Sequence, residues 1–403
     1  MQEQRPLFRL VCALGIAQTL AWASSYYLPA VLAVAMARDL QTTPTVVFAA
    51  FSLALVVSAA LGPFAGRLID RRGGRPVLIT SNLIFAVGLV AMAFSASVPQ
   101  LFIAWAIMGV GMASGLYESA FATVVRLREQ DARRAITGIT LFAGFASTIG
   151  WPLTAALASR FDWQTACMAW AALHLFVALP LNFSLPHAQP VPTHTPTTPV
   201  SDGTSSAIGN AVARRTAFLL AYVFAVAWFI STAMAAHLPG LLQGVGLSLA
   251  AAVAIAALVG PAQVGGRIVE FSVLQRFHPL LSARLAALAH PLGAVAIGFF
   301  GVSAAASFAV LHGAGNGILT IAIGTLPLLL FGPQGYGRRQ GLLMVPARLV
   351  QAGAPFLFGI AMARWGSGAL WISGVLGLPA VVALLLLRAP DSTSPASDKN
   401  LLP

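Results

Sequence analysis

The sequence predicts an all-α polytopic membrane protein with twelve transmembrane helices in two pseudo-symmetric six-helix bundles. Three observations predict this: the composition is 58% hydrophobic and only 8% charged, twelve apolar runs are long enough to span a bilayer, and motifs of the first half recur in the second. Soluble domains carry about 25% charged residues. The 23 basic and 11 acidic side chains of these 403 residues are therefore too few to cover a water-soluble protein.

The predicted spans follow from length, because a helix needs about 20 apolar residues to cross a hydrocarbon core of roughly 30 Å. Those of the first half cover residues 8–37, 44–66, 76–96, 99–126, 134–159 and 162–184. Those of the second half cover residues 215–241, 247–269, 279–301, 303–331, 338–363 and 367–388. The first run is longer than the apolar core of a signal peptide, so we expect a retained helix.

The two bundles are expected to be separate units. Residues 1–185 form the N-terminal bundle and residues 215–388 the C-terminal bundle. Residues 186–214 between them and the tail 389–403 are rich in Pro, Ser and Thr, and such segments do not bury a core. We therefore expect a disordered cytoplasmic linker and a disordered cytoplasmic tail.

Sequence patterns repeat between the halves in the same order. Met-Gly-Val-Gly at 108–111 matches His-Gly-Ala-Gly at 312–315. The Gly-Pro and Gly-Arg-x-x-acid pattern of residues 61–70 is echoed over residues 259–270. Two parallel repeats with a binding site at their interface are typical of secondary transporters.

The loop after the second predicted span reads Gly-Arg-Leu-Ile-Asp-Arg-Arg-Gly-Gly-Arg over residues 66–75. It resembles the signature loop of the major facilitator superfamily (MFS): Gly, three residues, Asp, Arg, any residue, Gly, any residue, then one or two basic residues. The resemblance implies the MFS fold, two bundles that rock about a central cavity to give alternating access. It also implies a latch toward the start of span eleven, near Gly337-Arg338. The latch residues are Gly66, Asp70, Arg71, Gly73 and Arg75.

The fifth predicted span adds a second resemblance. Its segment from Arg133-Arg134 to Gly150-Trp151-Pro152 is similar to the glycine-proline motif of MFS antiporters. The same segment is also similar to the span-five motif of the monocarboxylate and oxalate/formate-type branch. Both subfamilies therefore stay open.

Polar and aromatic residues within spans are candidate site residues, because polar groups are costly in a bilayer. In the MFS family, spans one, four, seven and ten line the cavity. The alternative for each hydroxyl or amide is a contact between packed helices; for Gly313 and Gly317 we expect close helix packing. The candidates for substrate binding on these spans are Gln18, Trp22, Ser25, Tyr26, Tyr27, Tyr117, Trp228, His237, His312 and Asn316.

Three further side chains are candidates because of their charge or their position next to a charge. Glu118 is the one carboxylate well inside a predicted span, so Glu118 or His312 could carry a coupling proton; the alternative for Glu118 is a structural partner of an arginine or hydroxyl. Arg348 lies about ten residues, or roughly 15 Å, into span eleven. A guanidinium there suits an oxyanion, with Gln351 one turn on. The alternative for Arg348 is an ion pair with Glu118 or a helix-end contact.

The favoured function is secondary active transport of a small organic solute, preferably an organic anion such as a monocarboxylate, with proton coupling. The alternative is proton-driven efflux of drugs or toxic compounds, which the aromatic candidates favour. Another class is a transporter-like receptor that binds without transport, which the complete latch loop argues against. We expect no enzyme activity, cofactor or metal site, because no nucleophile–base pair, metal-binding cluster or phosphate-binding loop occurs in the sequence.

The net charge of +12 predicts topology rather than a nucleic-acid partner. With a cytoplasmic amino terminus, 19 of the 23 basic residues, Arg267 among them, fall on the cytoplasmic side. Arg38, Arg160 and Arg364 lie on the other side and Arg348 lies within a span. We therefore expect a plasma-membrane protein, in a bacterial inner membrane, with both termini cytoplasmic. Its expected partners are the lipid bilayer, a small-molecule substrate and protons, and the protein is expected to be monomeric.

Overall fold

The computed structural model describes residues 4–127, 132–186, 207–331 and 336–387. All elements in these ranges are helical, which confirms the predicted all-α fold. Those before residue 187 are α1 (Gln4–Ser25), α2 (Pro29–Asp39), α3 (Pro44–Arg72), α4 (Gly74–Ala93), α5 (Val98–Gly115), α6 (Tyr117–Leu127), α7 (Ala132–Ala143), α8 (Ala146–Arg160), α9 (Trp163–Leu173), the π-helix η1 (His174–Ala178) and α10 (Leu179–Phe183). Those after residue 206 are α11 (Ala207–Gly244), α12 (Leu249–Ala256), α13 (Val259–Ser272), η2 (Leu274–Arg276), α14 (Pro279–Phe300), η3 (Gly301–Ala304), α15 (Ala305–Phe331), α16 (Tyr336–Trp365), η4 (Gly366–Gly368) and α17 (Ala369–Leu386).

Ten helical stretches of the described chain are long and apolar enough to cross a membrane. Two of them, Pro279–Phe331 and Leu342–Leu386, are 53 and 45 residues long, about twice the length that one crossing needs. Each holds two helices joined by a short 3-10 turn, η3 or η4. The ten stretches are therefore consistent with the twelve crossings predicted. The chain is an integral membrane protein.

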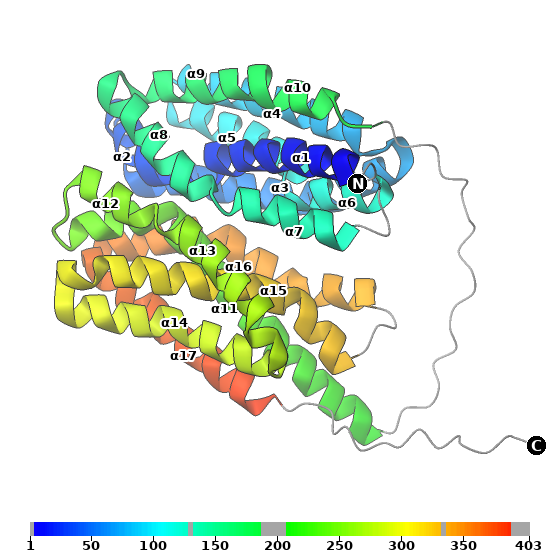
Figure 1. Cartoon of the computed structure of the whole chain (residues 1–403). Coiled ribbons are helices and arrows are strands. Elements are labelled where there is room, and N and C mark those ends of the chain that lie inside the picture. The colour runs from blue at the N-terminus through cyan, green and yellow to red at the C-terminus, as the bar shows by residue number, and fades with distance from the viewer. Residues whose placement is uncertain (1–3, 128–131, 187–206, 332–335, 388–403) are drawn as a thin grey trace, which may run out of the picture.

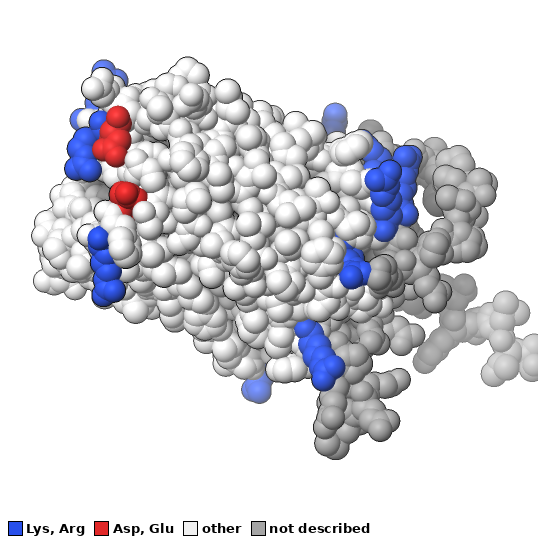
Figure 2. Space-filling view, turned by 90° about the horizontal axis from the view of Figure 1, so that it is seen from above, with Lys and Arg blue, Asp and Glu red and all other residues white. Residues whose placement is uncertain are grey.

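The helices gather in two groups. Figure 1 shows α1–α10 above α11–α17, with the helices of both groups running between the same two ends of the molecule. One large hydrophobic cluster is built mainly from the first group, and a second mainly from the other. Figure 2 shows the charged side chains toward the two ends, with a wide uncharged band between them, as a bilayer requires. Residues 187–206 of the predicted linker (186–214) and the whole predicted tail (389–403) lie outside the described residues, whereas residues 207–214 form the start of α11.

The loop between α3 and α4 contains the predicted latch. Gly73 has φ 85°, a left-handed conformation that favours glycine, and this explains the glycine of the motif at that turn. Arg71 is exposed, and the guanidinium of Arg75 lies 6.0 Å from the centre of the Phe183 ring. The side chain of Asp70 and those of residues 336–341 lie outside the described ones. The latch between them therefore stays a prediction.

The glycines of α15 allow α13 to approach closely, as the sequence predicted for Gly313 and Gly317. A Cβ atom at Gly313 would lie 2.6 Å from the carbonyl oxygen of Val259, and one at Gly317 would lie closer still to that of Gln263. These distances are shorter than any real carbon–oxygen contact at a Cβ. The two helices can therefore keep this separation only with glycine at both positions.

Gly317→Ala is expected to destabilise the protein by about 1–3 kcal/mol, because the added methyl group forces α13 and α15 apart. The measurement is the thermal unfolding midpoint of the purified protein in detergent. Gly265→Ala is the matched control: it lies on α13, and a Cβ there meets nothing within 4 Å. The control should unfold at the same or a slightly higher temperature, since alanine favours a helix. Equal midpoints for the two variants would contradict the packing argument.

Candidate substrate-binding site

A cavity of about 500 Å³ lies between the two groups of helices. Its wall draws on α1, α3, α5 and α6 from the first group and on α11, α13, α15 and α16 from the second. Most of the predicted site residues line it, although they are up to 329 positions apart in the chain (from 22 to 351). The predicted residues in this wall are Trp22, Tyr26, Tyr27, Tyr117, Glu118, Trp228, Asn316, Arg348 and Gln351.

Two spans are broken at the cavity. Tyr26–Leu28 separate α1 from α2, and Leu116 separates α5 from α6. A helix break in a bilayer leaves backbone groups that need a partner. Gln18 meets this need, because its Nε2 donates a hydrogen bond of 2.6 Å to the carbonyl oxygen of Gly115. Gln18 is only 1% exposed, so it positions the break rather than lining the cavity.

Aromatic rings form one side of the cavity around these breaks. The ring of Trp22 lies 4.7 Å from that of Tyr26 and 4.9 Å from that of Tyr117, measured between centroids. The ring of Tyr27 meets Trp151 edge-on at 5.1 Å. Tilted and edge-on pairs at these separations stabilise each other. The result is a preformed aromatic surface that suits an apolar or planar part of a substrate.

An ion pair crosses the cavity. The guanidinium of Arg348 on α16 donates a hydrogen bond to the carboxylate of Glu118 on α6, and this pair joins the two groups of helices. Glu118 lies in the first turn of α6, where the positive end of the helix dipole favours a carboxylate. The side chains are 42% and 61% exposed, so both charges face the cavity rather than a sealed core. Of the three interpretations of Arg348 that the sequence left open, the structure shows the ion pair with Glu118, and the anion contact stays a prediction.

A second contact between the groups lies one turn further along α16. Gln351 donates a hydrogen bond from Nε2 to the hydroxyl oxygen of Tyr26. Another turn on, the carbonyl oxygen of Pro355 is 2.8 Å from Nε2 of His237. His237 lines a separate cavity of about 800 Å³, nearer the end where α2 meets α3. Gln351 and Tyr26 line the central cavity, whereas His237 lines the other one.

Arg267 is a cavity residue that the sequence interpretation missed. It was counted with the cytoplasmic charges, but it lies on α13 and lines the cavity. Its Nη1 donates a hydrogen bond of 2.7 Å to the carbonyl oxygen of Thr140, and the hydroxyl of Tyr117 lies within its hydrogen-bonding reach. The loop motif gave no signal for this, because α13 continues past Arg267 to Ser272 just as α3 continues past Arg67 to Arg72.

The described part of the cavity wall is therefore positively charged. It holds the guanidinium groups of Arg267 and Arg348 and the single carboxylate of Glu118. No described carboxylate lies within ion-pair distance of Arg267. The described residues contain no group of three side chains placed to hold a metal ion. What the site can do chemically is bind an anion beside aromatic rings.

The remaining predicted residues lie elsewhere. Ser25 is fully buried and donates to the carbonyl oxygen of Ala21 at 2.6 Å. His312 lines a small cavity within the second group of helices. A further buried histidine, His174, is held by Asn82 and Ser24 at 2.9 and 2.8 Å inside the first group.

Comparison with known sequences decides the family. A sequence profile of the Major Facilitator Superfamily matches residues 14–311, most of the chain. The chain belongs to this superfamily. The fold agrees: 94% of this MFS chain superimposes on 96% of a D-xylose-proton symporter, with a TM-score of 0.70 and 14% sequence identity. The nucleoside transporter NupG superimposes with a TM-score of 0.74 and 14% identity, over 94% of this chain and 98% of that one.

Curated MFS relatives are similar over shorter segments. Multidrug resistance protein fnx1 of Schizosaccharomyces pombe is 34% identical over 28% of this chain and 21% of its own length. Multidrug resistance protein MdtL of Klebsiella pneumoniae is 28% identical over 43% of this chain and 45% of its own. Monocarboxylate transporter 14 of Mus musculus is 29% identical over 31% of this chain and 24% of its own. The chain thus matches about a fifth to a half of the length of these relatives.

Proposed function

We propose that this MFS transporter moves small organic anions, preferably monocarboxylates, together with protons by alternating access. The observation that carries the proposal is the ion pair of Glu118 and Arg348 across the cavity. A guanidinium holds a carboxylate through two parallel hydrogen bonds, so a substrate carboxylate can take the place of the Glu118 carboxylate. We further propose a monomer in a bacterial inner membrane with both termini cytoplasmic.

The ion pair also supplies the proposed coupling. A proton that binds Glu118 removes its negative charge, the pair opens, and Arg348 becomes available to the anion. Before binding, the one negative charge in the cavity is the Glu118 carboxylate; after binding, it is the substrate anion. The proton and the anion therefore enter together without a change in the net charge of the cavity. Arg267, fixed by the Thr140 carbonyl, is a second cation for the same anion. An unpaired charge buried in the closed cavity costs free energy, which disfavours transport of either ion alone.

Uptake into proteoliposomes tests this proposal directly. With the inside of the vesicles made alkaline, radiolabelled lactate is expected to accumulate above its external concentration, and an ionophore that collapses the pH gradient is expected to abolish the accumulation. Empty liposomes give the background, because undissociated lactic acid crosses bilayers by itself. Protein-dependent uptake that is indifferent to the pH gradient would contradict proton coupling, and no protein-dependent uptake of any carboxylate would contradict the anion assignment.

A second candidate function is proton-driven efflux of amphiphilic drugs or toxic compounds. The aromatic surface of Trp22, Tyr26, Tyr27 and Tyr117 favours it, and so do the names of the relatives fnx1 and MdtL. The cation Arg267, which has no described carboxylate within ion-pair distance, argues against a cationic drug, which it would repel. Proton-driven extrusion of a lipophilic cation, in the absence of carboxylate uptake, would favour this second function.

A further inference from the structure

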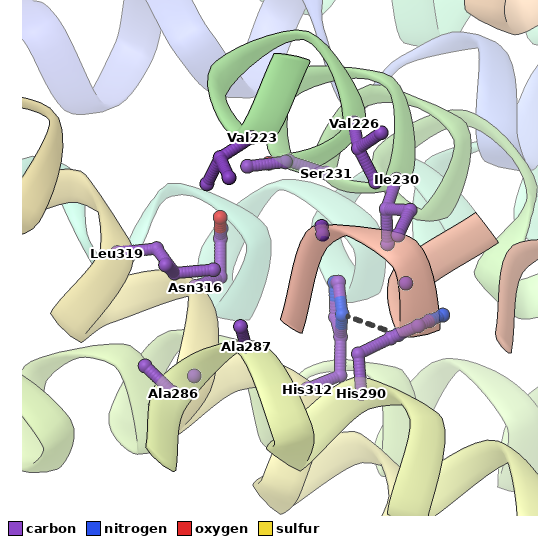
Figure 3. Close-up of a pocket in the computed structure, with 14 residues that line it drawn as sticks. Val223, Val226, Ile230, Ser231, Ala286, Ala287, His290, His312, Asn316 and Leu319 are labelled. Carbon is purple, nitrogen blue, oxygen red and sulfur yellow. Dashed lines mark hydrogen bonds between the residues drawn. The ribbon is translucent and has the colours of Figure 1, made fainter. Parts of the chain in front are cut away.

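A small cavity lies beside the central one, inside the second group of helices. It measures about 30 Å³ and is bounded by α11, α14, α15 and α17. Ser231 and Asn316 line both cavities, so they belong to a shared wall. Figure 3 shows Ser231 with the other α11 side chains on one side of the small cavity, and Asn316 and His312 on the other. A space of this size holds one water molecule or one hydroxyl group.

Two buried histidines from neighbouring helices meet at this cavity. His312 on α15 and His290 on α14 are 4% and 7% exposed, and their Nδ1 atoms are 3.0 Å apart (Figure 3). Nε2 of His290 is 3.0 Å from Oγ of Ser373 on α17. The Ser373 hydroxyl is in turn 2.7 Å from the carbonyl oxygen of Leu370. An unbroken chain of hydrogen bonds therefore runs from Leu370 to His312.

The carbonyl group at the end of this chain sets the direction of each hydrogen bond. A carbonyl oxygen only accepts, so Ser373 donates its one hydroxyl proton to Leu370. The Ser373 oxygen then accepts from His290, which must carry its proton on Nε2. Nδ1 of His290 is left with a lone pair, so His312 must donate to it from its own Nδ1. The remaining nitrogen of His312, Nε2, therefore presents a lone pair.

This arrangement differs from that of the buried histidine in the first group of helices. Both ring nitrogens of His174 are engaged, one by Asn82 and one by Ser24. Among the described residues, no side chain or backbone group is hydrogen-bonded to Nε2 of His312. Asn316, one turn further along α15, lines the same cavity and adds an amide that can donate or accept.

We propose that His312, Asn316 and Ser231 form a subsite that binds one O–H donor, and that this donor is the hydroxyl group of the transported anion. The inference rests on the proposed function for the anion, whose carboxylate lies in the central cavity at Arg348. The substrate class is therefore a small hydroxycarboxylate. A bound water molecule offers the same chemistry, and the transport experiment below separates the two donors. Ser373 and His290 act as positioning residues, because they fix which nitrogen of His312 is free.

The tautomers can be measured directly. Nitrogen-15 NMR of the histidine-labelled protein in lipid nanodiscs distinguishes an Nδ1–H from an Nε2–H imidazole, and the variants His290→Phe and His312→Phe assign the signals. At mildly alkaline pH, His312 is expected to carry its proton on Nδ1 and His290 on Nε2. An Nε2–H tautomer at His312 would overturn the proposal, because that nitrogen would then donate instead of accept.

Transport separates a substrate hydroxyl from water. The wild-type protein is expected to prefer lactate over propionate, the same acid without the hydroxyl group, by about tenfold in competition for uptake. Ser373 lines neither cavity. In Ser373→Ala the hydroxyl that fixes the direction of the hydrogen bonds is gone, so His312 can carry its proton on either nitrogen. The variant is therefore expected to lose most of the preference for lactate while still taking up propionate. Equal uptake of the two acids by the wild type would overturn the substrate hydroxyl and assign the subsite to water. Uptake of neither acid would instead overturn the proposed function. The tautomer measurement would still show whether Nε2 of His312 is a hydrogen-bond acceptor.

Discussion

Replacing Arg348 with Gln is expected to lower the uptake of a small carboxylate about 100-fold, measured as the initial rate in proteoliposomes at low substrate concentration. The glutamine keeps a hydrogen-bond donor but loses the charge and the forked geometry that hold a carboxylate at two points. Arg348→Lys is expected to lie between the wild type and the glutamine variant, since lysine restores the charge without the fork. Wild-type uptake by Arg348→Gln would contradict the role of Arg348 in binding the anion.

The matched control for this experiment is Arg364→Gln. Arg364 lies in the last turn of the same helix, α16, and is exposed. The change removes the same charge from the same helix but leaves the cavity untouched, so uptake is expected to stay at the wild-type level. The fold should survive both changes, because Arg348 faces a solvated cavity, where losing an ion pair costs about 1 kcal/mol or less. A parallel loss in both variants would point to net charge rather than to the site.

The sequence predicted the helical elements well because span length depends on a local property, the hydropathy of about 20 consecutive residues. The close packing at Gly313 and Gly317 could also be predicted, since two glycines one turn apart on a helix share a face. The turn at Gly73 followed from the loop motif, and its positive φ explains the glycine. These features depend on neighbours in the sequence.

The direction in which a side chain faces could not be predicted in the same way. Arg267 was assigned to the cytoplasmic side, although it lines the same cavity as Arg348. Its place in the cavity is fixed by the carbonyl oxygen of Thr140, 127 positions away in the chain. His290 was not among the candidate site residues, although its ring is hydrogen-bonded to His312 on the adjacent helix. Such contacts follow from helix rotation and tilt, which hydropathy does not determine.

Replacing Glu118 with Gln is expected to separate transport from the pH gradient. The glutamine is neutral at every pH, so Arg348 stays available to the anion whether or not a proton is present. Exchange of labelled for unlabelled lactate across the vesicle membrane is therefore expected to persist. Accumulation driven by a pH gradient is expected to disappear, with the internal to external ratio falling to about one, because a ligand that does not bind cannot bias the equilibrium. Accumulation at the wild-type level would show that the coupling proton binds elsewhere.

Measuring both exchange and accumulation distinguishes three possible roles of Glu118. If Glu118 served only to hold α6 against α16, the glutamine variant, which can still accept a hydrogen bond from Arg348, would retain both activities. If Glu118 contacted the substrate itself, both would fall together. Only a carboxylate that competes with the anion for Arg348 gives retained exchange with lost accumulation. Glu118→Asp serves as the control, since it keeps the titrating group on a side chain one methylene shorter and should preserve pH-driven accumulation at a reduced rate.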